Sequence, residues 1–311
     1  VVGTGKYGGN ATVTNTGDIT VINTAEGNAV GIIASSTGKY AVGSTIVSNS
    51  GDITVSASYA AVGIGAYSTN DSSIYNSGDI TVTTVEARSR ALYAVTDGIA
   101  LISNSGDLTV VGGIGAIGAG AAGAYGATTI NTGDVSVTST VYETGVNYYG
   151  QDYYLGGWAY GLFAASRAIG VATVINSGDI DVYGANKGTG ISANSRFGST
   201  YIAKSGDLNV VGDIKSAFGI YTKGSSYEEF IYGETGYTTV HNTGDISANG
   251  GFLAAGIYAI SQFGNVLVEN AGDITATAEL GRAFGIGAYT PWGNLDIVNI
   301  GDVTVSAVEN A

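Results

Sequence analysis

Ten aspartates, each preceded by a glycine, recur along the chain and are its most regular candidates for chemistry. Rows of carboxylates can bind hard cations such as Ca²⁺, and paired carboxylates can cleave glycosides. In seven of the ten copies the phrase is Asn-(Ser/Thr)-Gly-Asp followed by a β-branched run, as in NSGDITV from Asn49 to Val55. The ten aspartates are Asp18, Asp52, Asp79, Asp107, Asp134, Asp179, Asp207, Asp245, Asp273 and Asp302.

The spacing of these aspartates indicates a repeat architecture. Six of the nine gaps between them are 27 to 29 residues long, and the other three are 34, 45 and 38. A period of this length is typical of stacked rungs, each of which is too small to bury its apolar side alone. We therefore expect the carboxylates to serve mainly the architecture.

Each period contains three short apolar segments, which we interpret as strands. One precedes the Asn, one follows the Asp with alternating residues such as Ile19 and Val21, and a small apolar one follows later, as in VGIGAY from Val62 to Tyr67. The pattern predicts an all-β fold, a right-handed parallel β-helix (β-solenoid) of about ten rungs. It forms one domain over residues 1–311, with insertion loops at about 35–44, 141–158 and 225–237. A β-sandwich is the alternative, but it would not repeat one turn phrase ten times.

The turn phrase itself has a structural interpretation. We expect its glycine to supply a positive φ and its aspartate to accept backbone N–H groups of the next turn. Its asparagine is expected either to bond to its own backbone two residues on or to form a ladder with the asparagines of neighbouring rungs. Carboxylates stacked about 4.8 Å apart repel each other by about 0.9 kcal/mol per pair even in water, so something must offset the repulsion. An exposed, hydrogen-bonded ladder without a cofactor is the favoured reading, and calcium bound along the ladder is the alternative.

The longest insertion is rich in aromatic residues and is the candidate binding loop. Aromatic rings interleaved with Gly, Asn, Gln and Asp are typical of surfaces that contact glycans or protein receptors. The alternative is that this loop folds over the rod and merely packs. The candidate ligand-binding residues, one of them from the later insertion, are Tyr148, Tyr149, Tyr153, Tyr154, Trp158 and Tyr232.

Composition argues against several functions. The net charge is -14, with 25 acidic and 11 basic residues, so nucleic acid and anionic lipid are not expected partners. No apolar run is long enough for a membrane span. The chain has no Cys and only one histidine, His241, so no Ser-His-Asp or Cys-His set is available without it. We read His241 as structural and expect no enzyme activity; a polysaccharide-degrading β-helix enzyme is the weaker alternative, because the arginines are scattered.

The two ends of the chain fall in phase with the repeat. If one copy followed another, Asp302 and the next Asp18 would be 27 residues apart, which is the period of the rungs. No cap is evident at either end, although soluble solenoids cover their terminal rungs. The chain is therefore expected either to stack head-to-tail with itself into a filament or to continue into flanking repeats of a longer solenoid.

The alternating phrases N-(S/T)-G-D-I-T-V and G-I-Y-A, over about residues 10 to 307, resemble the passenger repeats of bacterial autotransporter-type adhesins and related surface exoproteins. The resemblance implies a β-helix displayed at the cell surface or released outside the cell, acting in adhesion or matrix. The predicted function is a non-catalytic structural or adhesive solenoid, a subunit or segment of a surface fibre. The alternative is a module that binds glycans or a receptor through the Tyr-rich loops.

Overall fold

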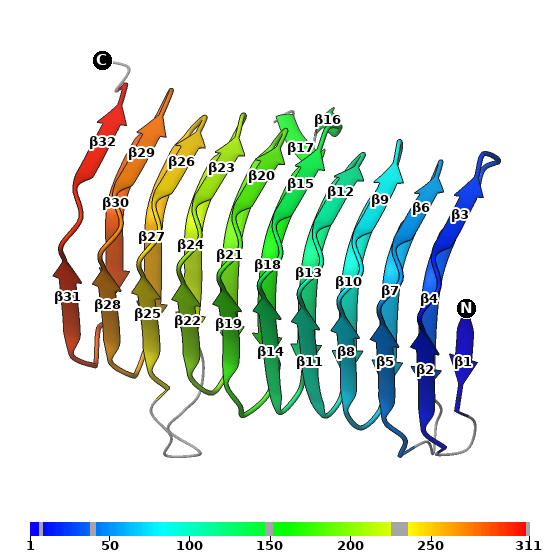
Figure 1. The fold of residues 1–311 in the computed structure, drawn as a ribbon. Coiled ribbons are helices and arrows are strands. Elements are labelled where there is room, and N and C mark those ends of the chain that lie inside the picture. The colour runs from blue at the N-terminus through cyan, green and yellow to red at the C-terminus, as the bar shows by residue number, and fades with distance from the viewer. Residues whose placement is uncertain (6–8, 38–41, 147–151, 225–235, 309–311) are drawn as a thin grey trace.

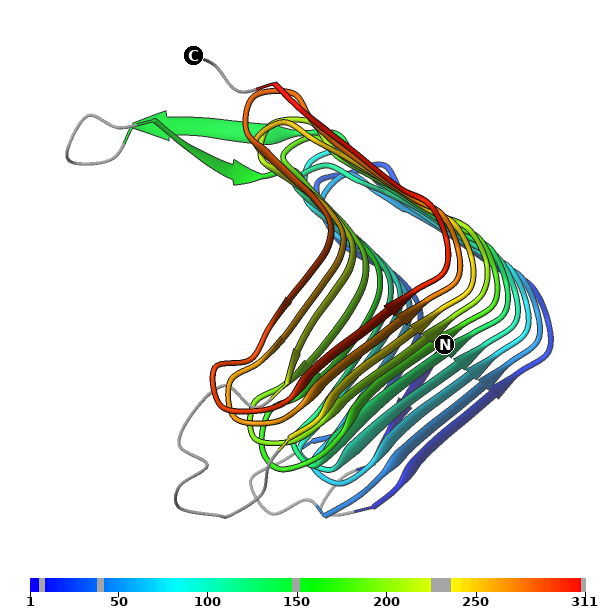
Figure 2. The same ribbon diagram turned by 90° about the vertical axis from the view of Figure 1, so that its left-hand side faces the viewer.

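The computed structural model describes residues 1–5, 9–37, 42–146, 152–224 and 236–308. The described residues form an all-β solenoid of three parallel sheets with ten strands each. We call the sheets A, B and C; they begin with β1, β2 and β3, respectively. In each rung the chain runs upward in Figure 1 through one strand of sheet B and one strand of sheet C, and it runs back down through one strand of sheet A. Seen from its C-terminal end, the chain turns anticlockwise toward the viewer (Figure 2), so the parallel β-helix is right-handed as predicted.

The strands of the three sheets follow one another at the period of the rungs. Sheet A contains β1 Val2–Thr4, β4 Ala29–Ser36, β7 Ala61–Ser68, β10 Arg88–Thr96, β13 Gly115–Gly123, β18 Trp158–Ser166, β21 Lys187–Ser195, β24 Ser216–Gly224, β27 Leu253–Ser261 and β30 Arg282–Tyr289. Sheet B contains β2 Ala11–Asn15, β5 Thr45–Asn49, β8 Ser72–Asn76, β11 Ile99–Asn104, β14 Gly126–Asn131, β19 Ala172–Asn176, β22 Thr200–Lys204, β25 Thr238–Asn242, β28 Val266–Asn270 and β31 Leu295–Asn299. Sheet C contains β3 Ile19–Asn23, β6 Ile53–Ala57, β9 Ile80–Thr84, β12 Leu108–Gly112, β15 Val135–Ser139, β20 Ile180–Gly184, β23 Leu208–Gly212, β26 Ile246–Gly250, β29 Ile274–Ala278 and β32 Val303–Ala307.

The core lies between sheet A and the other two sheets. Alternate residues of each strand point inward, and like residues stack on like, as Ile64 of β7 does on Leu92 of β10. Both of these side chains are fully buried, as are Ile102 of sheet B and Val110 of sheet C. The aliphatic positions of the third repeat segment therefore face inward, as the sequence predicted.

Sheet A bends sharply in the middle of its strands, and this bend makes its outer face concave (Figure 2). The ladder pairs Val62 with Arg90 and Ile64 with Leu92 but skips Gly63 and Ala91 between them. A Cβ atom at Gly63 would lie 2.7 Å from the carbonyl oxygen of Ala91 and 2.7 Å from a methyl of Ile80 in sheet C. The small residues in the middle of the sheet A strands, such as Gly63 in VGIGAY, therefore let the backbone of sheet A approach the core closely at the bend.

Two further strands form an antiparallel hairpin outside the rungs. β16 Tyr142–Val146 pairs with β17 Asp152–Gly156, and together they account for most of the longest insertion. The hairpin projects from one rim of the concave side of sheet A (Figure 2). Within the described part of the chain, no helix is long and apolar enough to cross a membrane.

Candidate functional site

The asparagines of the turn phrase form a buried ladder at the end of sheet B. The Nδ2 amide of Asn49 donates to the carbonyl oxygen of Gly51 at 2.6 Å and to Oδ1 of Asn76, one rung along, at 2.7 Å. The same two bonds recur at Asn76 and Asn104, so one amide closes its own turn and also joins neighbouring rungs. The side-chain amides of these asparagines therefore serve to hold the rungs together.

The aspartates of the turn phrase form a second ladder, parallel to the first and exposed to solvent. Oδ1 of Asp18 accepts the backbone N–H of Asp52 at 3.0 Å. The same bond joins every successive pair of turn aspartates, nine bonds in all, and the last one joins the N–H of Asp302 to Oδ1 of Asp273. Each of these bonds brings an N–H donor to a carboxylate and helps to offset the repulsion between them. Among the described residues, no group of three or more His, Cys, Asp or Glu side chains could hold a metal ion.

The glycine of the turn phrase has a different role from the one expected. The described glycines with a positive φ are Gly126, Gly156 and Gly157, and none of them belongs to a Gly-Asp pair, so the prediction of a positive φ in the turn was wrong. A Cβ atom at Gly51 would instead lie 2.2 Å from the carbonyl oxygen of Gly17 in the rung below. Glycine is required because successive turns stack too closely for any side chain.

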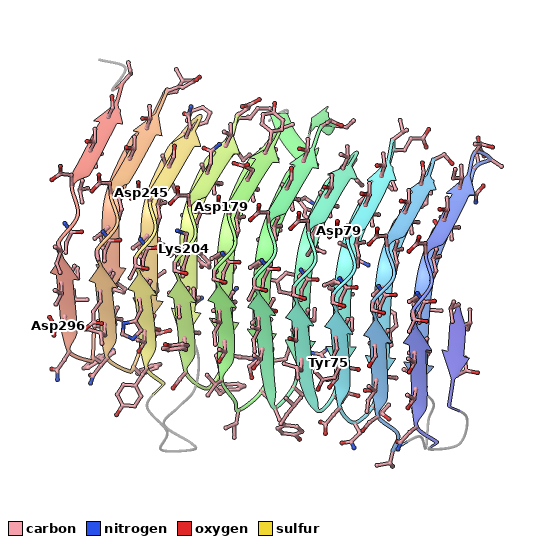
Figure 3. The ribbon with its side chains drawn as sticks, viewed as in Figure 1. Tyr75, Asp79, Asp179, Lys204, Asp245 and Asp296 are labelled. Atoms are coloured by element: carbon pink, nitrogen blue, oxygen red, sulfur yellow. The ribbon has the colours of Figure 1, made fainter. Side chains whose placement is uncertain are left out.

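Lys204 interrupts the asparagine ladder. Its side chain is 3% exposed, and its Nζ donates to the carbonyl oxygens of Gly206 and Asp245 in place of an asparagine amide (Figure 3). Burial lowers the pKa of Lys204 to about 8, against the opposing effect of the aspartates around it. Lysine has no acceptor and donates nothing to the next asparagine, so Oδ1 of Asn242 is buried without a hydrogen-bond partner.

The candidate aromatic residues of the insertions are only partly described. Tyr148, Tyr149 and Tyr232 lie outside the described residues. Tyr153 and Tyr154 lie on β17 of the projecting hairpin. Trp158, which we expected in the insertion loop, is instead the first residue of β18, on the concave face of sheet A. The described candidate residues therefore lie on the hairpin and on sheet A.

The concave face of sheet A carries a groove of about 780 Å³ that runs over β10, β13, β18 and β21. We call it the concave groove. Its aromatic residues form one connected row: Tyr93 lies 6.2 Å from Phe163, Phe163 lies 6.4 Å from Tyr160, and Tyr160 lies 5.8 Å from Trp158, measured between ring centroids. Rings fixed on the strands β10 and β18 make a preformed contact surface.

Two glycines of β13 make room for this row of rings. A Cβ atom at Gly120 would lie 2.1 Å from the ring of Phe163, and one at Gly115 would lie 2.4 Å from the ring of Trp158. The rings of Trp158 and Phe163 therefore occupy the space above these glycines of β13, and Phe163 reaches Tyr93 on β10 beyond it. Because Gly115 and Gly120 have no side chain, the space above them is free for the two rings.

Basic side chains gather along the same face. Arg88, Arg90, Lys187 and Lys215 line the concave groove, and Arg167, Arg196 and Lys223 line a smaller pocket beside it. These are seven of the 11 basic residues of a chain whose net charge is -14. The arginines looked scattered in the sequence because the rungs that align them are about 28 residues apart. No Asp or Glu is among the described residues that line the groove.

The basic side chains of the groove lie against its rings. The guanidinium of Arg88 is 5.5 Å from the ring centroid of Trp158, and that of Arg90 is 4.5 Å from the centroid of Tyr93. Such cation–π contacts hold the charges in place without neutralising them. Neither arginine forms an ion pair with a described carboxylate.

The single histidine lies away from this groove. His241, on β25 of sheet B, pairs with Glu269 at 2.6 Å and packs against the ring of Tyr201 at 5.6 Å. Its neighbours on the strand ladder are Ala203 and Glu269. His241 belongs to no group of three or more potential metal ligands among the described residues.

The terminal rungs expose residues that are buried in every inner rung. Ile297 of β31 and Val305 of β32 are 42% and 46% exposed. Their partners one rung below, Val268 and Ala276, are fully buried. Strands β30, β31 and β32 each have one unpaired edge, as do β1, β2 and β3 at the other end of the sheets.

Comparison with known families finds a match over more than half of the chain. The sequence model of the BigA third pectate lyase-like domain matches residues 39–217, a range that contains all the residues lining the concave groove. Comparisons with curated proteins and with solved structures returned no match.

Proposed function

The chain belongs to the family of BigA third pectate lyase-like domains, and from this premise we propose that it is a non-catalytic adhesive module of a bacterial surface protein. The family supports a pectate lyase-like β-helix. The finer assignment, to an autotransporter-type adhesin passenger displayed or released outside the cell, rests on the resemblance of the turn phrases and is part of the proposal.

The observation that carries the proposal is the concave groove. It combines a row of four aromatic rings with four basic side chains, in a chain that is otherwise acidic. Exposed aromatic and basic residues that converge in one hollow are typical of binding surfaces. The projecting hairpin β16–β17 stands at the rim of the same face and would widen the contact surface (Figure 2).

The same groove supports a binding role over a catalytic one. Glycoside hydrolysis ordinarily needs two carboxyl groups on either side of the scissile bond, and the described residues lining the groove include no carboxylate. The ten turn aspartates instead lie on another edge of the rod, where their carboxylates accept N–H groups of the next rung. Incubation with acidic and neutral polysaccharides should therefore release no new chain ends, and release of such ends would contradict the non-catalytic role.

Attachment of coated beads tests the adhesive role. Beads carrying the chain should adhere to a surface coated with bacterial or host polysaccharide, and the variants Tyr93→Ala and Trp158→Ala should adhere much less. Tyr75→Ala is the matched control, because Tyr75 is an exposed tyrosine on the outer face of sheet B (Figure 3). Equal adhesion by all three folded variants would show that the concave groove is not the contact surface.

Stacking of rungs is a second candidate function, favoured by the terminal rungs. A further rung, from another copy or a flanking repeat, would bury Ile297 and Val305 and pair the open strand edges. Heterologous contacts of this kind do not close on themselves and so build filaments. Electron microscopy over a range of concentrations should show rods that lengthen; rods of one length at every concentration would contradict self-stacking.

A further inference from the structure

We propose that the concave groove binds an anionic oligosaccharide, with one sugar ring over the polar floor of β21 and its acidic group beside Lys187. The inference rests on the proposed function and names the chemical class of its ligand. Ser192 and Asn194 of β21 line the groove, and Thr189 of the same strand lies buried beside it. We call the stretch of β21 that carries these three residues the β21 slot.

The β21 slot is a strip of polar residues between two rows of aromatic residues, which we call its walls. The strand register places Tyr160, Thr189 and Phe218 side by side on β18, β21 and β24, and it places Phe163, Ser192 and Tyr221 side by side further along. Two strands on either side of a third are about 9.6 Å apart. The walls are thus rings, and the floor between them is hydroxyl and amide.

The floor can hydrogen-bond to the hydroxyls of a sugar. Asn194 donates from Nδ2 to Oγ of Ser192 at 2.9 Å, which leaves the Ser192 hydroxyl hydrogen and the Asn194 Oδ1 at the floor of the slot. Aromatic rings stack on the apolar faces of sugars, while hydroxyls and amides bond their edges. Side chains of both kinds meet here on adjacent strands.

Two unused hydrogen-bonding atoms lie on either side of Lys187 in the sequence. Four buried side-chain polar atoms of the described residues lack a partner, and two of them are Oδ1 of Asn186 and Oγ1 of Thr189. A third, Nε of Arg90, belongs to the far side of the groove on β10. Thr189 is 1% exposed and Asn186 is 6% exposed. Buried polar groups are normally paired, so these unpaired atoms point to a partner that the chain itself does not supply.

The charge of the groove selects an acidic ligand. The Nζ of Lys187 lies 5.9 Å from the ring centroid of Tyr160 and 5.4 Å from that of Phe218, so it stands between the two walls at one end of the slot. It makes no ion pair with a described carboxylate. A carboxylate or sulfate on the sugar would supply that partner through a charge-assisted hydrogen bond. A neutral sugar would not supply a charged partner for Lys187.

Titration with defined oligosaccharides tests the inference. The probes are an oligogalacturonate, a heparin-derived oligosaccharide and a neutral galactose oligosaccharide of the same length. The two acidic probes separate a carboxylate from a sulfate as the preferred group. At least one of them should bind about tenfold more tightly than the neutral probe, and its affinity should fall as salt is added.

Substitution in the slot shows where the probe binds. Lys187→Gln should weaken the acidic probe about tenfold and should narrow its advantage over the neutral probe. Asn194→Ala should weaken both classes of sugar. Arg282→Gln is the matched control, since Arg282 lies on the same sheet three strands further along and its loss also removes one positive charge. Circular dichroism establishes that each variant keeps its β structure.

The outcomes separate the ligand from the proposed function. Binding of neutral and acidic probes with equal affinity, or equal effects of Lys187→Gln and Arg282→Gln, would overturn the inference. If no probe binds while Trp158→Ala still abolishes bead adhesion, the ligand class is wrong and the adhesive groove stands. If Trp158→Ala does not reduce bead adhesion, the proposed function of the groove is wrong, whatever the probes show.

Discussion

The side-chain amide of Asn131 donates to Oδ1 of Asn176 at 2.8 Å, although 45 residues separate them, the largest gap between successive Gly-Asp turns of the rod. The hydrogen bond has the same length, within 0.1 Å, as the bond between Asn104 and Asn131, which are 27 residues apart. The inserted hairpin β16–β17 is therefore looped out of the rod, and the register of the rungs on either side is unchanged.

Removal of the hairpin should leave the rod intact. Deleting residues 142–156 takes out β16 and β17 but leaves β15 and β18 to be joined by a short turn, as β12 and β13 are. Because loop length contributes weakly to stability, the free energy of unfolding in urea should change by less than about 1 kcal/mol. A large loss of stability would show that the hairpin braces the sheet rather than standing outside it.

Restoring the asparagine ladder should stabilise the protein. Lys204→Asn would give Oδ1 of Asn242 the donor it lacks and would remove a buried ammonium. We expect the free energy of unfolding at pH 7 to rise by about 1–3 kcal/mol. Lys223→Asn is the control for charge, and a change within about 0.5 kcal/mol is expected there. No gain from Lys204→Asn would contradict the ladder as a source of stability.

The same lysine predicts a pH dependence. Its pKa is about 8 in the folded chain and 10.5 when unperturbed, so the unfolded state binds more protons between these values. The free energy of unfolding contributed by Lys204 therefore rises with pH across this window, and the penalty for burying the charge is fully present below pH 8. The advantage of Lys204→Asn over the wild type should shrink from pH 8 to 10.5, and an advantage that stayed constant would refute the shift.

Stacked turn glycines can be tested against a matched glycine at the end of the column. A Cβ atom at Gly106 would lie 2.2 Å from the carbonyl oxygen of Gly78, whereas one at Gly17 would have nothing within 4 Å. Gly106→Ala should lower the free energy of unfolding by about 2–4 kcal/mol, because the backbone of the neighbouring turn must move to admit the methyl group. Gly17→Ala should lower it by less than about 0.5 kcal/mol. Equal costs measured by urea unfolding would mean that conformational freedom, rather than close stacking, explains the glycines.

The aspartate ladder should need no metal. Since each carboxylate accepts a backbone N–H from the next rung, a chelator should leave the melting temperature unchanged. Sodium and calcium chloride at equal ionic strength should raise it alike by screening the exposed row of charges. A rise specific to calcium, reversed by the chelator, would instead support the calcium alternative.

The sequence predicted the architecture because each rung repeats the same local chemistry. The spacing from Asp18 to Asp302 gave the period, and the alternation at Ile19 and Val21 gave the strands. The positive φ of the turn glycine was wrongly expected, because the close contact between Gly51 and Gly17 involves backbone of a different rung. A single copy of the phrase carries no sign of that contact.

The concave groove was not predicted, because it is a property of aligned rungs. Arg90 and Lys187 are 97 positions apart in the sequence, yet their strands are separated in sheet A by only β13 and β18. The bend that makes the face concave depends on small residues whose significance appears only against the core of sheet C. The one available signal was Trp158, which was placed in the insertion although the strand begins there.

A crystal structure of the chain with bound oligogalacturonate or heparin-derived oligosaccharide tests the central claim most directly. The account predicts a sugar ring over Ser192 and Asn194, between the aromatic walls, with its acidic group beside Lys187. Sugar bound only on the outer faces of sheets B and C, or at the ends of the rod, would contradict it.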